Sequence, residues 1–182
     1  MTKKIVITGG LGYIGTELCK IYSGVSWHHK VIVIDNRFIS ERINQIRNWN
    51  MDFIHGDILD KDMINKNFRD ADIVHHLAGV TDVPRTKNEA SDERDKKIKL
   101  IGEKGTQNIL EAINEKCKII FPSTHVIYEG INEVKKDIGE EEEAKPVLSY
   151  SSSKATNERQ LRESGKNYII LRLGSVYGYS ND

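Results

Sequence analysis

Tyr150 and Lys154 are the two side chains of this sequence best suited to acid–base chemistry. Lys154 follows Tyr150 by one turn in a helix-like stretch, so both side chains lie on one face of the expected helix. Because a free tyrosine has a pKa of about 10, lowering it to neutrality requires roughly 4 kcal/mol of stabilisation of the phenolate. A lysine ammonium one turn away is a source of that stabilisation. The same spacing also occurs on ordinary exposed helices, so the surrounding sequence must decide between the two interpretations.

A glycine-rich turn follows the first apolar run of the chain. Gly10, Gly12 and Gly15 fit the spacing G-x-G-x-x-G. Gly9 together with Gly12 and Gly15 also fits G-x-x-G-x-x-G. A Cβ at such positions would block a tight turn and hold the backbone away from a pyrophosphate, whose charge is stabilised by amides at a helix N-terminus. Since an amphipathic stretch follows, the turn predicts a dinucleotide-binding site.

Asp35 indicates which dinucleotide this site prefers. It ends the second apolar run, about 20 residues after Gly15, where an acid reaches the ribose hydroxyls of the adenosine. Its carboxylate would hydrogen-bond a free 2′-hydroxyl and repel a 2′-phosphate. The turn itself holds no arginine to offset this repulsion, although Arg37 is close. We therefore expect NAD to be preferred over NADP.

Short apolar runs alternate with helical stretches along the chain, which is the pattern of a parallel sheet with crossover helices. The expected strands are residues 5–8, 31–35, 53–55, 73–77, 119–122 and 169–173. The expected helices are residues 13–23, 60–68, about 88–116, and 149–164. Right-handed crossovers then give an α/β fold with a doubly wound parallel sheet, the Rossmann fold, over residues 1–182. Ser123 and Thr124 follow the fifth run, at the sheet edge where ligands of such folds bind.

Composition limits the partners and the compartment. The 182 residues suit one domain, and 27 basic against 27 acidic residues argue against nucleic acid or a charged membrane surface as a partner. Two cysteines, Cys19 and Cys117, are too few for a disulfide framework and suggest a reducing compartment. Without an apolar run long enough to span a membrane or to serve as a secretory signal, we expect a cytoplasmic protein. The neighbouring His75 and His76 would point to opposite faces of a strand, so no metal site is expected.

Together these motifs resemble the extended short-chain dehydrogenase/reductase family, specifically its nucleotide-sugar epimerases and dehydratases. The resemblance covers residues 3–178. Residues 8–15 look like the family turn T-G-G-x-G-Y-I-G, residues 35–36 like its ribose-binding pair, and residues 56–58 like the segment that meets the adenine. Residues 76–79 look like the family stretch H-x-A-A. Residues 122–128 look like S-[ST]-x-x-V-Y-G, and residues 172–178 look like R-x-x-N-V-Y-G.

The resemblance implies both a cofactor site and a catalytic site. The implied NAD-binding residues are Gly9, Gly12, Tyr13, Ile14, Gly15, Asp35, Asn36, Asp57, Ile58, Leu77, Ala78, Gly79, Tyr150 and Lys154. The implied catalytic residues are Thr124, Tyr150 and Lys154. Tyr150 would take the proton from a sugar hydroxyl while the hydride of the same carbon passes to NAD. Thr124 would hydrogen-bond that hydroxyl, and Lys154 would hold the nicotinamide ribose.

The resemblance also bears on the reaction and the substrate. Dehydratases of the family typically carry an Asp-Glu pair after the catalytic threonine, whereas His125 and Val126 stand here, which disfavours dehydration. Residues 81–86 are similar to the V-P-R-[ST] loop of some UDP-hexose 4-epimerases, which favours epimerisation of a UDP-sugar. The helix that ends near Lys116 and the helix that begins near Tyr150 resemble those that form a four-helix bundle in family dimers. A homodimer through these two helices is therefore expected.

Three departures keep other functions open. Gly102 stands where the family has the asparagine of N-x-x-G-T, and Ser175 where it has the asparagine before V-Y-G. The family also continues well beyond Asp182, with a small substrate-binding subdomain that we expect to be absent here. The alternatives are therefore a dehydratase, a non-catalytic NAD-binding module, and a reductase of a small carbonyl compound.

Overall fold

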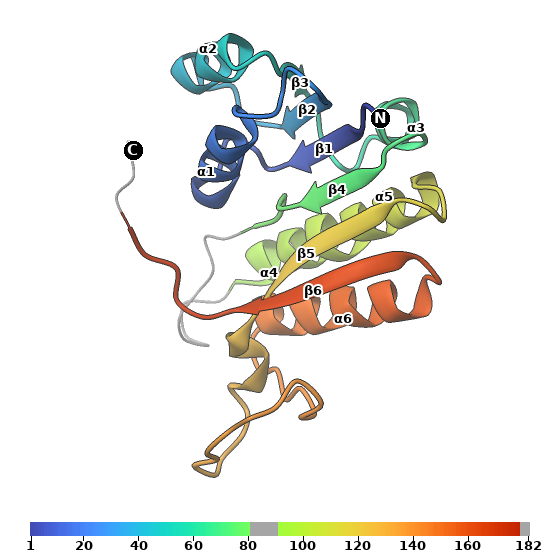
Figure 1. Ribbon diagram of the computed structural model, residues 1–182. Coiled ribbons are helices and arrows are strands. Elements are labelled where there is room, and N and C mark those ends of the chain that lie inside the picture. Colours follow the sequence, from blue (N-terminus) through green and yellow to red (C-terminus); the bar gives the residue numbers. More distant parts are fainter. Residues whose placement is uncertain (81–90, 179–182) are drawn as a thin grey trace.

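The computed structural model of the chain describes residues 1–80 and 91–178. Its centre is a six-stranded parallel sheet with the strand order β3-β2-β1-β4-β5-β6 (Figure 1). The strands are β1 (Lys4–Thr8), β2 (Lys30–Asp35), β3 (Asp52–His55), β4 (Ile73–His76), β5 (Lys118–Thr124) and β6 (Asn167–Leu173). All six expected strands are present, and this order is that of the doubly wound Rossmann fold.

Helices cross over between these strands. They are α1 (Tyr13–Tyr22), α2 (Ser40–Asn48), α3 (Lys61–Phe68), α4 (Asp92–Lys99), a π-helical turn (Leu100–Lys104), α5 (Gly105–Ala112), a 3₁₀ turn (His125–Tyr128) and α6 (Ser149–Glu163). The helix expected over about 88–116 is therefore wrong as a single element. A π-helical turn divides it, its last turn ends at Ala112, and residues 88–90 lie outside the described part.

Helix α2 was not expected from the sequence. Only Ile43 and Ile46 of its nine residues are buried. No side chain caps its start, which leaves little of the pattern by which a helix is recognised. Packing of these two isoleucines beneath β2 and β3 stabilises a helix whose own sequence is mostly polar.

The two faces of the sheet pack against different helices. On one face, Val6, Val74 and Ile119 pack with side chains of α3, α5 and α6. On the other face, Ile5 and Val33 pack with α1 and α2. No described helix covers that second face at β6, where Ile169 is 39% and Leu171 is 44% exposed (Figure 1). Burial on both sides explains why the centres of β1 and β2 read as unbroken apolar runs, whereas β4 ends in the two histidines His75 and His76.

The carboxyl ends of the strands bring distant segments to one edge of the sheet. Gly9 follows β1, Asp35 ends β2, and Leu77 follows β4. The strand order reverses between β1 and β4, which is where open α/β sheets bind their ligands. No helix among residues 1–80 and 91–178 is both long and apolar enough to cross a membrane.

Candidate active site

The glycine turn joins β1 to α1 in a conformation that requires glycine. Gly9 has φ +68°, and a Cβ there would lie 2.7 Å from the amide nitrogen of Ala78. A Cβ at Gly15 would lie 2.3 Å from the carbonyl oxygen of Gly9. Gly12 precedes α1 and provides no side-chain cap, so the first amides of the helix lack a side-chain acceptor. This backbone cradle, which a Cβ would fill, fits a cofactor pyrophosphate.

Replacing Gly9 by alanine is expected to lower the free energy of unfolding by about 1–3 kcal/mol. The new Cβ would meet the backbone of Ala78 and force a side chain into the left-handed region. Urea denaturation measures the difference. Gly139→Ala is the matched control, because nothing lies within 4 Å of the added Cβ there. Equal stability of the two variants would contradict this account of the turn.

Asp35 anchors the glycine turn from the end of β2. Its side chain is only 4% exposed. Oδ2 accepts a hydrogen bond from the amide of Leu11 at 2.9 Å. Oδ1 accepts from the amide of Arg37 at 2.9 Å and from its Nε at 3.2 Å. The carboxylate lies at the end of β2, as the spacing predicts, but it is paired with Arg37, which the sequence alone marks only as a neighbour.

The segment after β3 is fixed by α5. Asp57 accepts hydrogen bonds from Asn36 Nδ2 at 3.1 Å and from the amide of Leu59 at 2.9 Å. The carbonyl of Ile58 accepts a hydrogen bond from Asn108 Nδ2 at 3.0 Å. A Cβ at Gly105 would lie 2.3 Å from Ile58 Cδ1, so the lack of a side chain there lets Ile58 pack on the helix.

A buried histidine holds the segment after β4. His76 lies within hydrogen-bonding distance of Thr8 Oγ1 and Thr106 Oγ1, at 3.0 Å each. Thr8 Oγ1 in turn accepts a hydrogen bond from the amide of Ala78 at 3.1 Å. Burial, with a smaller contribution from the Lys154 ammonium, lowers the pKa of His76 to about 3, so the imidazole is neutral at physiological pH. This chain of contacts positions residues 77–79, the segment expected to line the cofactor.

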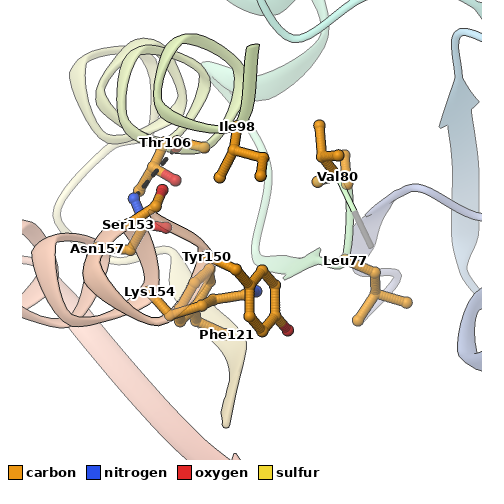
Figure 2. Close-up of a pocket in the computed structure, with 12 residues that line it drawn as sticks. Leu77, Val80, Ile98, Thr106, Phe121, Tyr150, Ser153, Lys154 and Asn157 are labelled. Atoms are coloured by element: carbon orange, nitrogen blue, oxygen red, sulfur yellow. Dashed lines mark hydrogen bonds between the residues drawn. The ribbon is translucent and has the colours of Figure 1, made fainter. Parts of the chain in front are cut away.

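Tyr150 and Lys154 meet that segment across a small cavity (Figure 2). The cavity has a volume of about 30 Å³. Its lining includes Leu77, Ala78, Gly79, Phe121, Tyr150, Ser153, Lys154 and Asn157. The four lining residues from α6 are spaced by three and four positions and therefore share one face of the helix. The structure thus brings the candidate acid–base pair to the segment expected to line the cofactor.

Lys154 is held beneath Tyr150 by contacts with β5. Its Nζ donates a hydrogen bond to the carbonyl of Pro122 at 2.8 Å. The same nitrogen lies 4.4 Å from the ring centroid of Phe121 and 5.9 Å from that of Tyr150. Burial lowers the pKa of Lys154 to about 8, so its ammonium is still mostly protonated at neutral pH.

The pKa of Tyr150 differs from the value that its spacing to Lys154 suggests. Burial raises the pKa of Tyr150 above its ordinary value. The ammonium is bonded to Pro122 and does not touch the phenol, so desolvation outweighs its attraction. In this chain, therefore, the charge of Lys154 does not offset the effect of burial on the pKa of Tyr150.

Thr124 ends β5 but does not line the cavity beneath Tyr150. Its hydroxyl is buried and accepts a hydrogen bond from the amide of Val126 at 3.2 Å, which caps the 3₁₀ turn. Accepting this bond leaves the hydroxyl proton available to another acceptor.

Glu129 ties the 3₁₀ turn to the start of α6 and was missed in the sequence. Its Oε1 accepts hydrogen bonds from the amides of Val147 and Leu148, at 2.7 Å each, and from the hydroxyl of Ser151. The N-cap Leu148 has no side chain able to cap the helix. Glu129 therefore performs that function from a distant position and links the turn after Thr124 to the helix of Tyr150.

Glu158 is the centre of a buried charge network that the sequence also did not reveal. Its side chain is 2% exposed and accepts hydrogen bonds from Arg172 Nη2 at 2.8 Å and Arg162 Nη2 at 2.9 Å. Ser123 Oγ donates to it at 2.6 Å. Burial alone raises the pKa of Glu158, but these hydrogen bonds outweigh burial and hold the pKa below its ordinary value. The network fixes α6 against β5 and β6.

The π-helical turn that contains Gly102 is connected to α6 even though the asparagine of the family motif is missing. A Cβ at this position would lie 2.4 Å from Ser153 Oγ, so glycine allows α6 to come close. Asn157 Nδ2 donates to the carbonyl of Gly102 at 3.1 Å, and Gln160 Nε2 donates to that of Glu103 at 3.1 Å. These bonds serve carbonyls of the π-helical turn, where the regular helical pattern is broken.

The structure does not connect every feature expected from the sequence with this site. Residues 81–86, the loop similar to V-P-R-[ST], lie outside the described residues. Ser175 is exposed after β6, away from the cavity lining. Within the described residues, no three His, Cys, Asp or Glu side chains are grouped as metal ligands would be.

Comparison with known proteins identifies relatives along almost the whole chain. The profile described as "NAD dependent epimerase/dehydratase family" matches residues 5–182. A dTDP-D-glucose 4,6-dehydratase from Dictyostelium discoideum is 29% identical over 197 residues, which cover 97% of this chain and 44% of the relative. The UDP-glucuronic acid 4-epimerase from Bacillus cereus in complex with NAD has a TM-score of 0.79 at 28% identity, covering 96% of this chain and 57% of that one.

A second solved structure is similar to this chain over almost the same span. The UDP-glucose 4-epimerase from Thermotoga maritima with UDP-glucose has a TM-score of 0.80 at 28% identity, covering 98% of this chain and 58% of that one. The chain thus spans about half the length of these relatives. Because the family profile covers nearly all of the sequence and the fold agrees over the same span, this protein belongs to the NAD-dependent epimerase/dehydratase family.

Proposed function

We propose that this chain is the cofactor-binding and catalytic part of an NAD-dependent enzyme that acts on a nucleotide sugar, with 4-epimerisation of a UDP-hexose as its reaction. The observation that carries the proposal is the position of Tyr150 and Lys154 beside residues 77–79 (Figure 2). The glycine turn lies at the same edge of the sheet. A protein that only bound a dinucleotide would need no acid–base group there. The relatives that bind NAD and UDP-glucose support the cofactor and the substrate class.

In the proposed reaction, Tyr150 removes the proton from a hydroxyl of the sugar and later returns it. Bound NAD supplies the hydride acceptor for the oxidation and the hydride donor for the reduction. Thr124 donates its hydroxyl proton to the reacting oxygen, because its own oxygen already accepts a bond from Val126. The ammonium of Lys154 favours the ionised form of Tyr150 electrostatically and is placed to bind the ribose next to the nicotinamide.

His125 favours epimerisation over dehydration. Loss of water from an oxidised sugar needs an additional acid and base, which related dehydratases supply as an Asp-Glu pair after the catalytic threonine. Here His125 Nδ1 lies 3.1 Å from the carbonyl oxygen of Leu173, and the next residue is Val126. Neither side chain is a carboxylic acid, so the chain lacks the pair that dehydration would use at these positions.

Product analysis tests the proposed reaction. We expect the NAD-saturated chain to convert UDP-glucose into its 4-epimer, because Tyr150 and Lys154 meet residues 77–79 at one cavity. Nuclear magnetic resonance of the sugar nucleotide distinguishes a 4-epimer from a 4-keto-6-deoxy product. NAD binding without any oxidation of UDP-glucose or dTDP-glucose would favour a non-catalytic module, and steady consumption of NADH with a small aldehyde would favour a reductase.

Replacing Lys154 by methionine is expected to weaken NAD binding by about tenfold and to slow sugar oxidation as well. The change removes the ammonium and its bond to Pro122 but keeps a side chain of similar length. Calorimetric titration with NAD measures the first effect. Lys166→Met is the matched control, because Lys166 Nζ makes an equivalent 2.8 Å bond to the carbonyl of Ile113 away from the cavity. Unchanged NAD affinity in Lys154→Met would remove the ribose-binding assignment.

We propose that the enzyme is a homodimer through α6 and the interrupted helix made of α4, the π-helical turn and α5. On the surface of the π-helical turn and the end of α4, Leu100 is 54% exposed and lies among Lys99, Glu103 and Lys104. Because its surroundings are charged, association there depends on ion pairs and should weaken at high salt. Light scattering at low and high salt tests this expectation, and a monomer under both conditions would contradict it.

A further inference from the structure

We propose that the adenosine end of the cofactor pocket accepts a 2′-phosphate as well as a free 2′-hydroxyl, and that Arg37 determines the ratio of the two affinities. The inference rests on the proposed NAD site, because it concerns the same pocket. It extends that site to a second cofactor, NADP. An unpaired Asp35 carboxylate would disfavour this cofactor by repelling its 2′-phosphate.

The carboxylate of Asp35 is not presented alone to a ligand. Arg37 Nε lies 3.2 Å from Oδ1 and Nη2 lies 3.3 Å from Oδ2, which forms a two-pronged ion pair. The Asp35 side chain is 4% exposed, whereas that of Arg37 is 52% exposed. An approaching group therefore meets the guanidinium before it meets the carboxylate.

The guanidinium also reaches the glycine turn. A Cβ built on Gly12 would lie 3.6 Å from Arg37 Nη2, so the cation lies close to the N-terminus of α1. That terminus carries a partial positive charge of its own. A 2′-phosphate at the end of β2 would thus lie close to two positive groups.

Helix α2 brings a second arginine to the same place. Arg42 Nη1 donates a hydrogen bond to the carbonyl of Leu11, whose amide is bound by Asp35. One carboxylate and two guanidinium groups therefore lie at the Leu11 end of the turn. Arginine binds phosphate oxygens well because its planar group offers several donors in a fixed arrangement.

A free 2′-hydroxyl remains acceptable in this arrangement. Arg37 is half exposed, and an ion pair with such a partner is weak enough to rearrange when a ligand approaches. Asp35 then offers an oxygen to the hydroxyl, as in the expected binding of NAD. The pocket can thus use Asp35 for one cofactor and Arg37 for the other.

Calorimetric titration with 5′-AMP and 2′,5′-ADP tests the proposal on the adenosine half alone. We expect the unmodified chain to bind 2′,5′-ADP within about tenfold of 5′-AMP. Arg37→Leu should weaken 2′,5′-ADP by about tenfold or more while changing 5′-AMP by less than about threefold. Arg47→Leu removes an exposed charge from the last turn of α2 and should change neither affinity appreciably. Titrations with NADP and NAD should show the same effects of each substitution, with NADP in place of 2′,5′-ADP and NAD in place of 5′-AMP.

Two further titrations test whether the charge of Arg37 is responsible for 2′,5′-ADP binding. Arg37→Lys keeps the charge and should retain more 2′,5′-ADP binding than Arg37→Leu. Added salt should weaken 2′,5′-ADP more than 5′-AMP, because the additional phosphate interacts through charge. Strong rejection of 2′,5′-ADP by the unmodified chain, or an Arg37→Leu variant with an unchanged ratio, would overturn the proposal while NAD binding stands. Failure of both NAD and 5′-AMP to bind would overturn the cofactor pocket itself.

Discussion

Tyr150→Phe is expected to lower the rate of sugar oxidation by about two to four powers of ten while leaving NAD affinity nearly unchanged. The substitution deletes the phenolic oxygen proposed to take the proton and keeps the ring that lines the cavity with Leu77 and Lys154. Single-turnover formation of the reduced cofactor after addition of UDP-glucose measures the chemical step. Calorimetry with NAD measures binding independently.

The matched control for this prediction is Tyr168→Phe, which removes a hydroxyl from a partly exposed tyrosine on β6, outside the cavity. Because burial raises the pKa of Tyr150, the oxidation rate of the unmodified chain should increase with pH as the phenolate becomes populated. That increase should disappear in Tyr150→Phe. Near-normal oxidation in the variant would show that the catalytic assignment is wrong.

Glu158→Ala is expected to lower the free energy of unfolding by about 3–5 kcal/mol. The substitution leaves the guanidinium of Arg172, whose side chain is 16% exposed, without its buried carboxylate. It also removes the acceptor of the Ser123 hydroxyl. Urea denaturation followed by circular dichroism measures the loss. Glu163→Ala, at an exposed position of the same helix, should have an effect below about 1 kcal/mol.

The pH dependence of stability tests the same network. The pKa of Glu158 is lowered in the folded chain, so the folded state holds this proton less tightly than the unfolded state does. The stabilisation is complete above the unfolded pKa of about 4.3 and is lost as the pH falls through the lower folded value. The stability difference between the unmodified chain and Glu158→Ala should therefore narrow in acid. A constant difference across that range would contradict the ionised network.

Local spacing in the sequence determined the sheet, the glycine turn and the pair of Tyr150 and Lys154. Each of these features depends on residues within one strand, one turn or one helix face. Unbroken apolar runs specify strands buried on both sides, and glycine spacing specifies a turn whose contacts exclude a Cβ. Such patterns can be recognised without knowing what packs against them.

Tertiary structure alone decided the contacts between segments that are far apart in the chain. Glu129 caps α6 across about 20 residues. Arg42 reaches Leu11 from α2, a helix that is hard to recognise in the sequence because most of its residues are polar. The interrupted helix from Asp92 to Ala112 likewise depends on Asn157 of α6, which binds a carbonyl of the π-helical turn. Hydrogen bonds and ion pairs of this kind have no sequence period, because their geometry exists only after the crossovers bring the segments together.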